Sequence, residues 1–131
     1  MDTARRGLLA ALGIAGVATC LPLHACLKEN RTMYGLIGKM KSTPGQRDAL
    51  IAILLEGIGG MPGCLSYVVA QDPADADAVW ITEVWTDAAS HKASLSLPAV
   101  QQAIARARPL IAGFDSHVET VPVGGHGLAA A

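Results

Sequence analysis

The sequence has no excess of charge of either sign and no run of basic residues. Ten Lys and Arg residues stand against eleven Asp and Glu residues, which gives a formal net charge of −1 over 131 residues. Surfaces that bind nucleic acid normally carry clustered Lys and Arg side chains. The composition therefore argues against a nucleic-acid partner. The length is that of a single domain, because domains typically have roughly 100–200 residues.

Potential metal ligands are few and scattered. The chain has four histidines and three cysteines, Cys20, Cys26 and Cys64. Paired cysteines or histidines at the spacing typical of a zinc site are absent from the sequence. The first two cysteines fall in the N-terminal segment described next, so the remaining domain has one cysteine and cannot form an internal disulfide. We interpret Cys64 as a small buried apolar residue and predict neither a metal site nor a bound cofactor.

The longest uncharged run of the sequence lies at the N-terminus. Arg5 and Arg6 precede a Leu-, Ala- and Gly-rich segment, which is the layout of a secretory signal, and the paired arginines resemble a twin-arginine export signal. Cleavage after Ala25, lipidation at Cys26 within a lipoprotein-like box, and an uncleaved anchor are the alternatives. We expect residues 1–27 to be a signal peptide. The mature protein would then be periplasmic or extracellular, or held at the cell envelope by a lipid on Cys26, which would be its one contact with a membrane.

The rest of the chain alternates between strand-like and helix-like segments. Strands are expected at residues 33–41, 64–71, 78–85 and 114–121, because these segments are rich in β-branched and aromatic residues. Helices are expected from Thr43 as N-cap and Pro44 as first helical residue, directly after residue 85, and at 99–111. The order β-α-β-β-α-β is that of the ferredoxin-like split motif. It predicts an α+β domain at residues 33–121 with a four-stranded antiparallel sheet, followed by a disordered tail at 122–131.

Two helices can cover only one face of such a sheet. The other face would remain substantially apolar in this sequence. A bare apolar face of that size is normally covered by a partner surface, and a second copy of the same chain is the simplest cover. We therefore expect a homodimer.

The stretch VWITEVWTDAASHKASLS, in the middle of the chain, combines a strand, a helix and three chemically versatile side chains. Glu83 and Trp85 are two residues apart in the strand, so they lie on the same face. Thr86 or Asp87 can cap the helix that follows, and this helix carries His91. The pattern predicts that a carboxylate, an indole and an imidazole form one wall of a pocket.

The same stretch resembles the antibiotic biosynthesis monooxygenase family, whose members include proteins assigned as quinol monooxygenases. The resemblance extends over residues 33–121 and rests on Glu83, Trp85, an Ala-rich turn, His91 and the following Ala93-Ser94. It implies a dimeric α+β barrel that oxidises polycyclic phenols or quinols with O₂ and without metal or flavin. The alternative is a non-catalytic dimeric module that binds a small apolar or haem-like ligand. The haem-degrading relatives are expected to use an Asn on the first strand, and residues 33–41 contain none.

Four residues are the candidates for catalysis. His91 is the candidate base, because the ordinary pKa of histidine, about 6.5, suits proton abstraction near neutrality. Trp85 would stack on an aromatic substrate, and Tyr67 would donate a hydrogen bond to a developing oxyanion. Glu83 would either orient His91 or form an ion pair across the subunit interface. Each of these side chains also has a purely structural alternative, as packing or surface residues.

Overall fold

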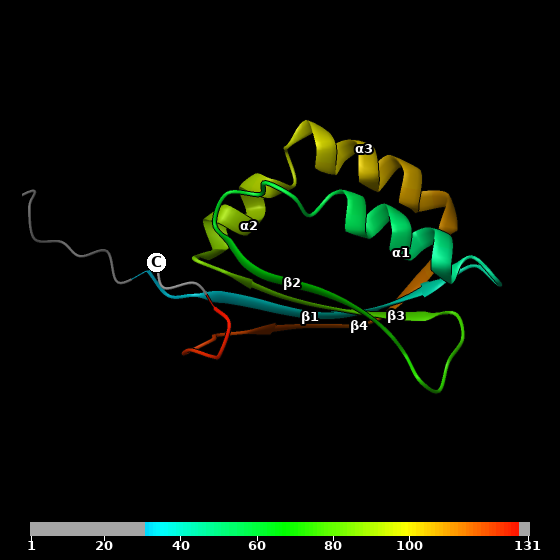
Figure 1. Ribbon diagram of the computed structural model, residues 1–131, viewed down its shortest axis with the longest axis horizontal. Coiled ribbons are helices and arrows are strands. Elements are labelled where there is room, and N and C mark those ends of the chain that lie inside the picture. Colours follow the sequence, from blue (N-terminus) through cyan, green and yellow to red (C-terminus); the bar gives the residue numbers. More distant parts are fainter. Residues whose placement is uncertain (1–30, 129–131) are drawn as a thin grey trace, which may run out of the picture.

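The protein, described by a computed structural model over residues 31–128, is an antiparallel sheet with all its helices on one face (Figure 1). The elements in chain order are β1 (Tyr34–Ser42), α1 (Arg47–Glu56), β2 (Cys64–Gln71), β3 (Ala78–Trp85), α2 (Ala88–Ser94), α3 (Pro98–Ala107), the 3₁₀ turn η2 (Arg108–Leu110) and β4 (Ile111–Thr120). The predicted signal peptide at residues 1–27 lies outside the described residues. Within residues 31–128, no helix is both long enough and apolar enough to span a bilayer.

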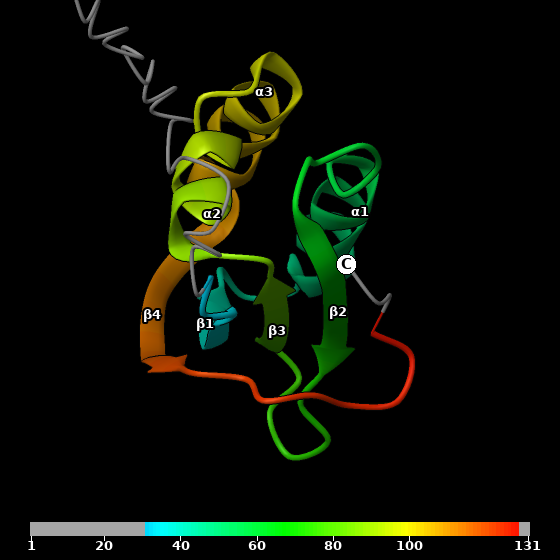
Figure 2. The same ribbon diagram turned by 90° about the vertical axis from the view of Figure 1, so that its left-hand side faces the viewer.

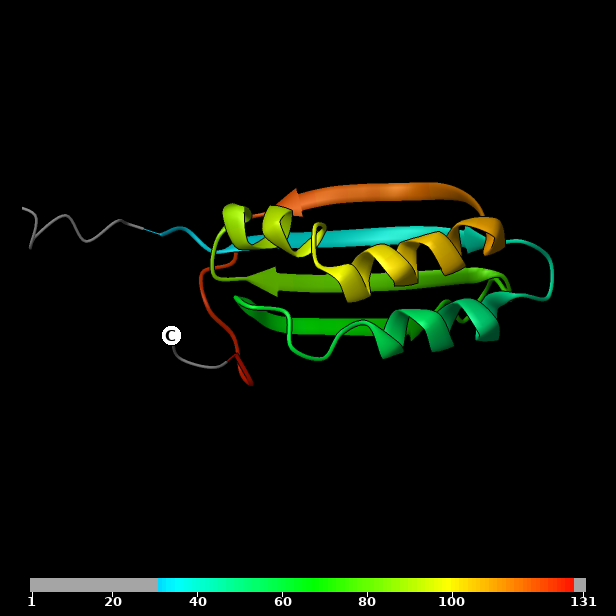
Figure 3. The ribbon, with the colours of Figure 1, turned by 90° about the horizontal axis from the view of Figure 1, so that it is seen from above.

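The sheet has the strand order β2-β3-β1-β4, with antiparallel neighbours throughout. Seen end-on and from above, α1 lies over the β2 side of the sheet, and α2 and α3 lie toward the β4 side (Figures 2 and 3). This confirms the predicted ferredoxin-like α+β fold, with the region between β3 and β4 divided into two helices. The opposite sheet face carries no helix.

The core lies between the sheet and the helices. It is formed by Leu50 and Ile53 from α1, Val79 and Ile81 from β3, and Ala107 from the end of α3. The β3 residues alternate in burial as a half-buried strand should, and Val79, Ile81, Glu83 and Trp85 all face the helices. The core thereby fixes which face of β3 is presented to the helices.

The predicted start of the first helix is wrong by several residues. Thr43 and Pro44 belong to a turn in which the N–H of Gln46 donates to the carbonyl oxygen of Thr43 at 3.0 Å, and α1 begins only at Arg47. Gly45 occupies the left-handed region at φ 75°. A helix cannot pass through that conformation, so the helix begins after the glycine.

The boundary between the last helix and the last strand also differs from the prediction. Pro109 lacks a backbone N–H and its ring crowds the preceding turn, so α3 ends at Ala107 instead of residue 111 and β4 begins at Ile111 instead of Phe114. A β-bulge then shifts the pairing of β4 with β1, so that Phe114 pairs with Met40. Because residues paired across strands share a face, the bulge directs Phe114 to the helix side of the sheet.

A candidate active site between the sheet and the helices

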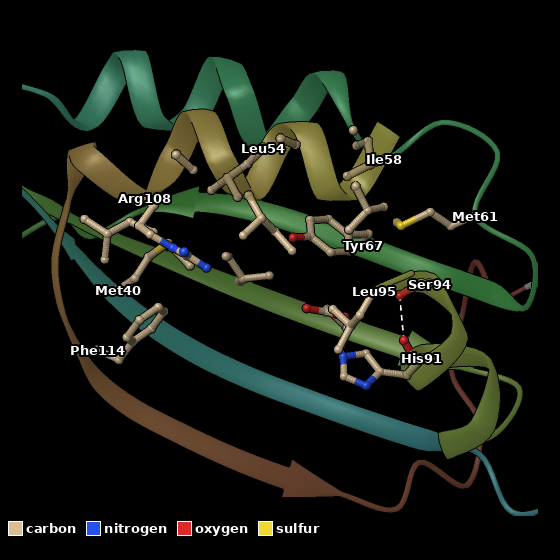
Figure 4. Close-up of a pocket in the computed structure, with 18 of the residues that line it drawn as sticks. Met40, Leu54, Ile58, Met61, Tyr67, His91, Ser94, Leu95, Arg108 and Phe114 are labelled. Atoms are coloured by element: carbon tan, nitrogen blue, oxygen red, sulfur yellow. Dashed lines mark hydrogen bonds and ion pairs between the residues drawn. The ribbon is translucent and has the colours of Figure 1, made fainter. Parts of the chain in front are cut away.

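A cavity of about 610 Å³ lies between the sheet and the helices (Figure 4). Its walls are mainly aliphatic and aromatic, which is typical of sites for small organic molecules. The chemically functional side chains among its lining residues are Tyr67, Glu83, Trp85, His91, Ser94 and Arg108. All four sequence-predicted site residues therefore meet at one cavity. Within residues 31–128, no three His, Cys, Asp or Glu side chains are grouped so that they could hold a metal ion.

Glu83 is the centre of one end of the cavity. Its side chain accepts a hydrogen bond from Trp85 Nε1 at 2.8 Å, and His91 Nε2 lies 3.7 Å from the same oxygen, Oε2. The rings of Trp85 and His91 meet edge-on, with centroids 5.4 Å apart and an interplanar angle of 75°. The indole thus donates to the carboxylate from one side, and the imidazole faces the carboxylate from another. A general base, here His91, is commonly oriented by a neighbouring carboxylate in this way.

Burial determines the electrostatics at this end. Glu83 is only 8% exposed, and this desolvation raises the pKa of the Glu83 carboxyl above its ordinary value. The hydrogen bond from Trp85, and the imidazoles of His91 and His117 when they carry a proton, act in the opposite direction and lower the same pKa. A proton taken up by His91 would therefore place a positive charge beside a buried carboxylate whose other side-chain contact is the neutral indole of Trp85.

Helix α2 holds His91 in place through short local contacts. Asp87 caps the helix, because its side chain accepts from the backbone N–H of Ser90 at 2.7 Å, as one of the two predicted caps. Gly63 lies against the same residue: a Cβ at Gly63 would be 2.6 Å from Ser90, and the glycine has φ 80°. The Ser94 hydroxyl donates to the backbone oxygen of His91 at 2.6 Å. The helix is thus fixed at both ends, and with it the position of the imidazole.

Tyr67 reaches the cavity from β2, where it pairs with Glu83 across the strands. Its ring points into the cavity (Figure 4). Burial, and then the negative charge of Glu83, raise the pKa of the Tyr67 phenol well above its ordinary value. The hydroxyl therefore stays protonated, and it has no hydrogen-bond partner among residues 31–128. It is a donor available to a bound molecule.

Cys64 lies at the edge of this region. It pairs with Trp85 across the strands and is half-buried. Burial, followed by the charge of Glu83, raises the pKa of the Cys64 thiol. A thiol held in its protonated form is a poor nucleophile, which agrees with its interpretation as a small packing residue.

The structure adds two residues to the four candidates for catalysis. The ring of Tyr34 lies against His91, with centroids 4.9 Å apart, and its hydroxyl donates to Glu119 Oε1 at 3.0 Å. Arg108 lines the cavity at the end away from His91 (Figure 4). Both positions depend on strand register or on the break at Pro109, so no local sequence signal could have identified them.

The comparisons with known proteins agree with this architecture. Residues 33–106 match the sequence profile of the family described as antibiotic biosynthesis monooxygenase. A crystal structure from Chloroflexus aurantiacus J-10-fl, provisionally named for that same activity, is 76% identical and superposes with a TM-score of 0.74, covering 75% of this chain and 100% of the other. No curated protein matches the chain.

More distant structures share the fold alone. A Pseudomonas aeruginosa protein is 21% identical with a TM-score of 0.63, covering 71% of this chain and 96% of its own. A Shewanella oneidensis protein is 23% identical with a TM-score of 0.61, covering 70% of this chain and 94% of its own. With the profile match over most of the described residues and the high identity to the Chloroflexus structure, the chain belongs to the antibiotic biosynthesis monooxygenase family.

Proposed function

We propose that the protein is an exported monooxygenase that oxidises a quinol-like or polycyclic phenolic substrate with O₂, using neither metal nor flavin. Membership in the family supports the reaction class. The observation that carries the proposal is the apolar cavity of about 610 Å³ with an imidazole, a buried carboxyl and an indole at one end. Such a cavity can hold a flat aromatic molecule against its apolar walls.

The residues at that end have distinct roles. His91 accepts the proton of the substrate hydroxyl as general base. Glu83, at 3.7 Å from His91 Nε2, stabilises the imidazolium that results. Trp85 holds Glu83 by its hydrogen bond of 2.8 Å and closes the wall of the cavity. Tyr67 donates its free hydroxyl to the oxygen that carries the developing negative charge.

The redox balance needs no further reductant. The phenolate passes one electron to O₂, and the resulting radical pair joins through a new bond between oxygen and the ring carbon next to the phenolate. The O–O bond then breaks while that ring carbon loses its proton, and the terminal oxygen leaves as water. For 1,4-dihydroxynaphthalene, one molecule of quinol and one of O₂ give one hydroxynaphthoquinone and one water. The quinol is oxidised by four electrons and O₂ is reduced by four.

The dimer is part of the same proposal. The helix-free face of the sheet exposes Val68 by 53% and Val118 by 49%, and register places Ile37 on that face beside Val118. A second copy would cover this apolar face, and sedimentation of the protein at the mass of two chains would support it. Val68→Asp should shift the protein toward the monomer, whereas a wild-type protein that sediments as a monomer at micromolar concentration would contradict a dimer.

Export rests on residues 1–27, where the paired arginines and the uncharged run lie. Replacing both arginines by lysine should retain the full-length chain in the cytoplasm if the twin-arginine route is used. The intact mass of the mature protein would distinguish plain cleavage after Ala25 from lipidation at Cys26, because both leave Cys26 as the first residue and only the second adds a lipid. A full-length, uncleaved chain recovered from the cytoplasmic fraction would overturn export.

The activity is tested by supplying the purified protein with 1,4-dihydroxynaphthalene and following O₂ consumption with an electrode. Catalysed uptake above the spontaneous rate, with one O₂ consumed per quinol and hydroxynaphthoquinone as product, is the expected result. Uptake equal to the rate without protein would contradict the proposal. In that case a haem titration that shifts the Soret band would favour the alternative, a module that binds a haem-like ligand.

A further inference from the structure

The cavity carries an unpaired positive charge at the end away from Glu83 and His91. Arg108 is one of its lining residues, and Figure 4 shows the guanidinium pointing into the cavity, on the side of Met40 and Phe114. Among residues 31–128, Arg108 has no ion pair and no side-chain hydrogen bond. Its neighbour Arg106 differs: its Nη1 contacts Glu56 Oε2 at 2.6 Å on the surface between α3 and α1.

The backbone explains why these two arginines differ. Arg106 is the penultimate residue of α3, whereas Arg108 begins η2, where Pro109 ends the α-helix. The change from α-helix to 3₁₀ turn directs Arg108 toward the sheet. The bulge in β4 brings Phe114 to the same side of the sheet, opposite Met40. The guanidinium is thus framed by apolar side chains from two strands.

The charges that line the cavity are arranged with opposite signs at its two ends. Glu83 lies at one end, and its negative form would repel an anion placed beside it. Arg108 lies at the other end as an exposed residue, so solvent screens part of its attraction for an anion and the contact depends on the geometry of the guanidinium. Guanidinium groups bind carboxylates through paired, charge-assisted hydrogen bonds. A ligand with a carboxylate at one end would therefore enter in a single orientation.

We propose that Arg108 is a specificity-determining residue that binds a carboxylate on the aromatic ligand, at the end remote from the hydroxyl that faces His91. The inferred ligand class is an aromatic hydroxy acid of about two fused rings. The inference rests on the proposed function for what happens to the hydroxyl, but the carboxylate contact itself is a binding property. It can be measured without turnover.

A structural alternative is that Arg108 only covers the mouth of the cavity. Long basic side chains often pack their aliphatic stem on apolar surface while the charged group stays in water. Arg108→Met distinguishes the two, because it keeps most of the stem and removes the charge. Arg106→Met is the matched control, since it removes an equal charge two residues away that is engaged outside the cavity.

The experiment compares two probes by isothermal titration calorimetry. One is 6-hydroxy-2-naphthoate, and the other is its neutral counterpart, 6-(hydroxymethyl)-2-naphthol. The wild-type protein should bind the carboxylate at least about tenfold more tightly, as a charge-assisted hydrogen bond provides. Arg108→Met should abolish that preference, Arg106→Met should retain it, and Arg108→Lys should retain only part, because lysine lacks the planar fork.

Several results would overturn the inference. They are equal affinity of the wild-type protein for the two probes, a preference that survives in Arg108→Met, and no detectable binding of either probe. The outcome is separable from that of the proposed function. Catalysed O₂ uptake with neutral 1,4-dihydroxynaphthalene but no carboxylate preference would refute only the role of Arg108. A preference lost in Arg108→Met, without O₂ uptake on any quinol, would refute only the oxygenase.

Discussion

Strand β3 carries two tryptophans on opposite faces, and each donates its indole N–H to a carboxylate. Trp85, on the helix side, donates to Glu83 at 2.8 Å, and Trp80, on the helix-free side, donates to Asp72 at the same distance. The same pair of chemical groups thus occurs twice within one strand and its hairpin. What surrounds each carboxylate is different.

Asp72 has several partners besides Trp80. It accepts from the backbone N–H groups of Ala74 at 2.8 Å and Asp75 at 3.0 Å, and Lys39 Nζ lies 3.3 Å from its Oδ2. The hydrogen bond from Trp80, with these further contacts, holds the pKa of the Asp72 carboxyl well below its usual range. This carboxylate closes the hairpin between β2 and β3, so its role is structural.

Glu83 is the opposite case. Burial raises the pKa of the Glu83 carboxyl, and its neighbours inside the cavity are an indole and an imidazole. No lysine or arginine among residues 31–128 forms an ion pair with it. A buried carboxyl with a raised pKa beside a histidine in a cavity is a frequent sign of a functional site. An indole–carboxylate pair alone therefore does not indicate a functional site. Glu83 differs from Asp72 because it is buried and has no counterpart of the Lys39 contact.

The largest expected effect concerns the stability contributed by the two indoles. Trp85 is 1% exposed and Trp80 is half-buried. Trp85→Ala should lower the free energy of unfolding by about 3–5 kcal/mol, as for other fully buried aromatic residues. Trp80→Ala should cost less, about 1–2 kcal/mol. Urea denaturation of both variants measures the difference, and equal losses would contradict the contrast between the two faces.

The two carboxylates should give pH dependences of opposite sign. Between its ordinary and its raised pKa, Glu83 binds more protons in the folded state, so its contribution to stability falls as the pH rises through that window. The pKa of Asp72 is depressed, so its contribution is fully present above the ordinary value of about 3.9 and is lost as the pH falls below it.

Two isosteric variants, Glu83→Gln and Asp72→Asn, sharpen this contrast. Relative to the wild-type protein, Glu83→Gln should become more stable as the pH rises from the acid range to neutrality, because it removes a buried charge while keeping an acceptor for Trp85. Relative to the wild-type protein, Asp72→Asn should become less stable as the pH rises toward the ordinary aspartate pKa of about 3.9, because only the wild-type protein gains the stabilising carboxylate. Urea denaturation across the pH range measures both differences, and slopes of the same sign would refute the assignment.

A smaller effect is expected from Tyr34. Tyr34→Phe keeps the ring against His91 and removes the hydrogen bond to Glu119, which lies at an exposed position. The free energy of unfolding should fall by about 0.5–1.5 kcal/mol. If Tyr34 also positions the imidazole, an equal loss of transition-state stabilisation would lower kcat/KM about two- to tenfold. A shifted pH profile of kcat/KM identifies positioning. An unchanged profile with lowered stability would assign Tyr34 to packing alone.

Local signals predicted much of the fold and part of the site. The alternation of β3 placed Glu83 and Trp85 on one face, and Asp87 caps the helix that carries His91. These features depend on residues within one turn or one strand of each other. The element order followed from the same local patterns.

Features that depend on distant parts of the chain were not accessible in this way. The β4 bulge between Phe114 and Ser116 and the packing of Tyr34 on His91 require the register between strands. The positive φ of Gly45 and the break at Pro109 moved both helix boundaries, and the second of these directed Arg108 into the cavity. The residues predicted from the sequence therefore lie at one end of the cavity, and the position of Arg108 at the other end is known only from the structure.

The central claim is that His91, facing the buried Glu83, is the base that ionises a phenolic substrate in the cavity. The direct measurement is kcat/KM for O₂-dependent oxidation of 1,4-dihydroxynaphthalene at pH 7 by the wild-type protein, by His91→Gln and by His126→Gln, in which the exposed histidine near the C-terminus serves as control. A loss of about 100- to 10,000-fold in His91→Gln alone is predicted, as for removal of a general base. Equal rates in all three proteins would contradict it.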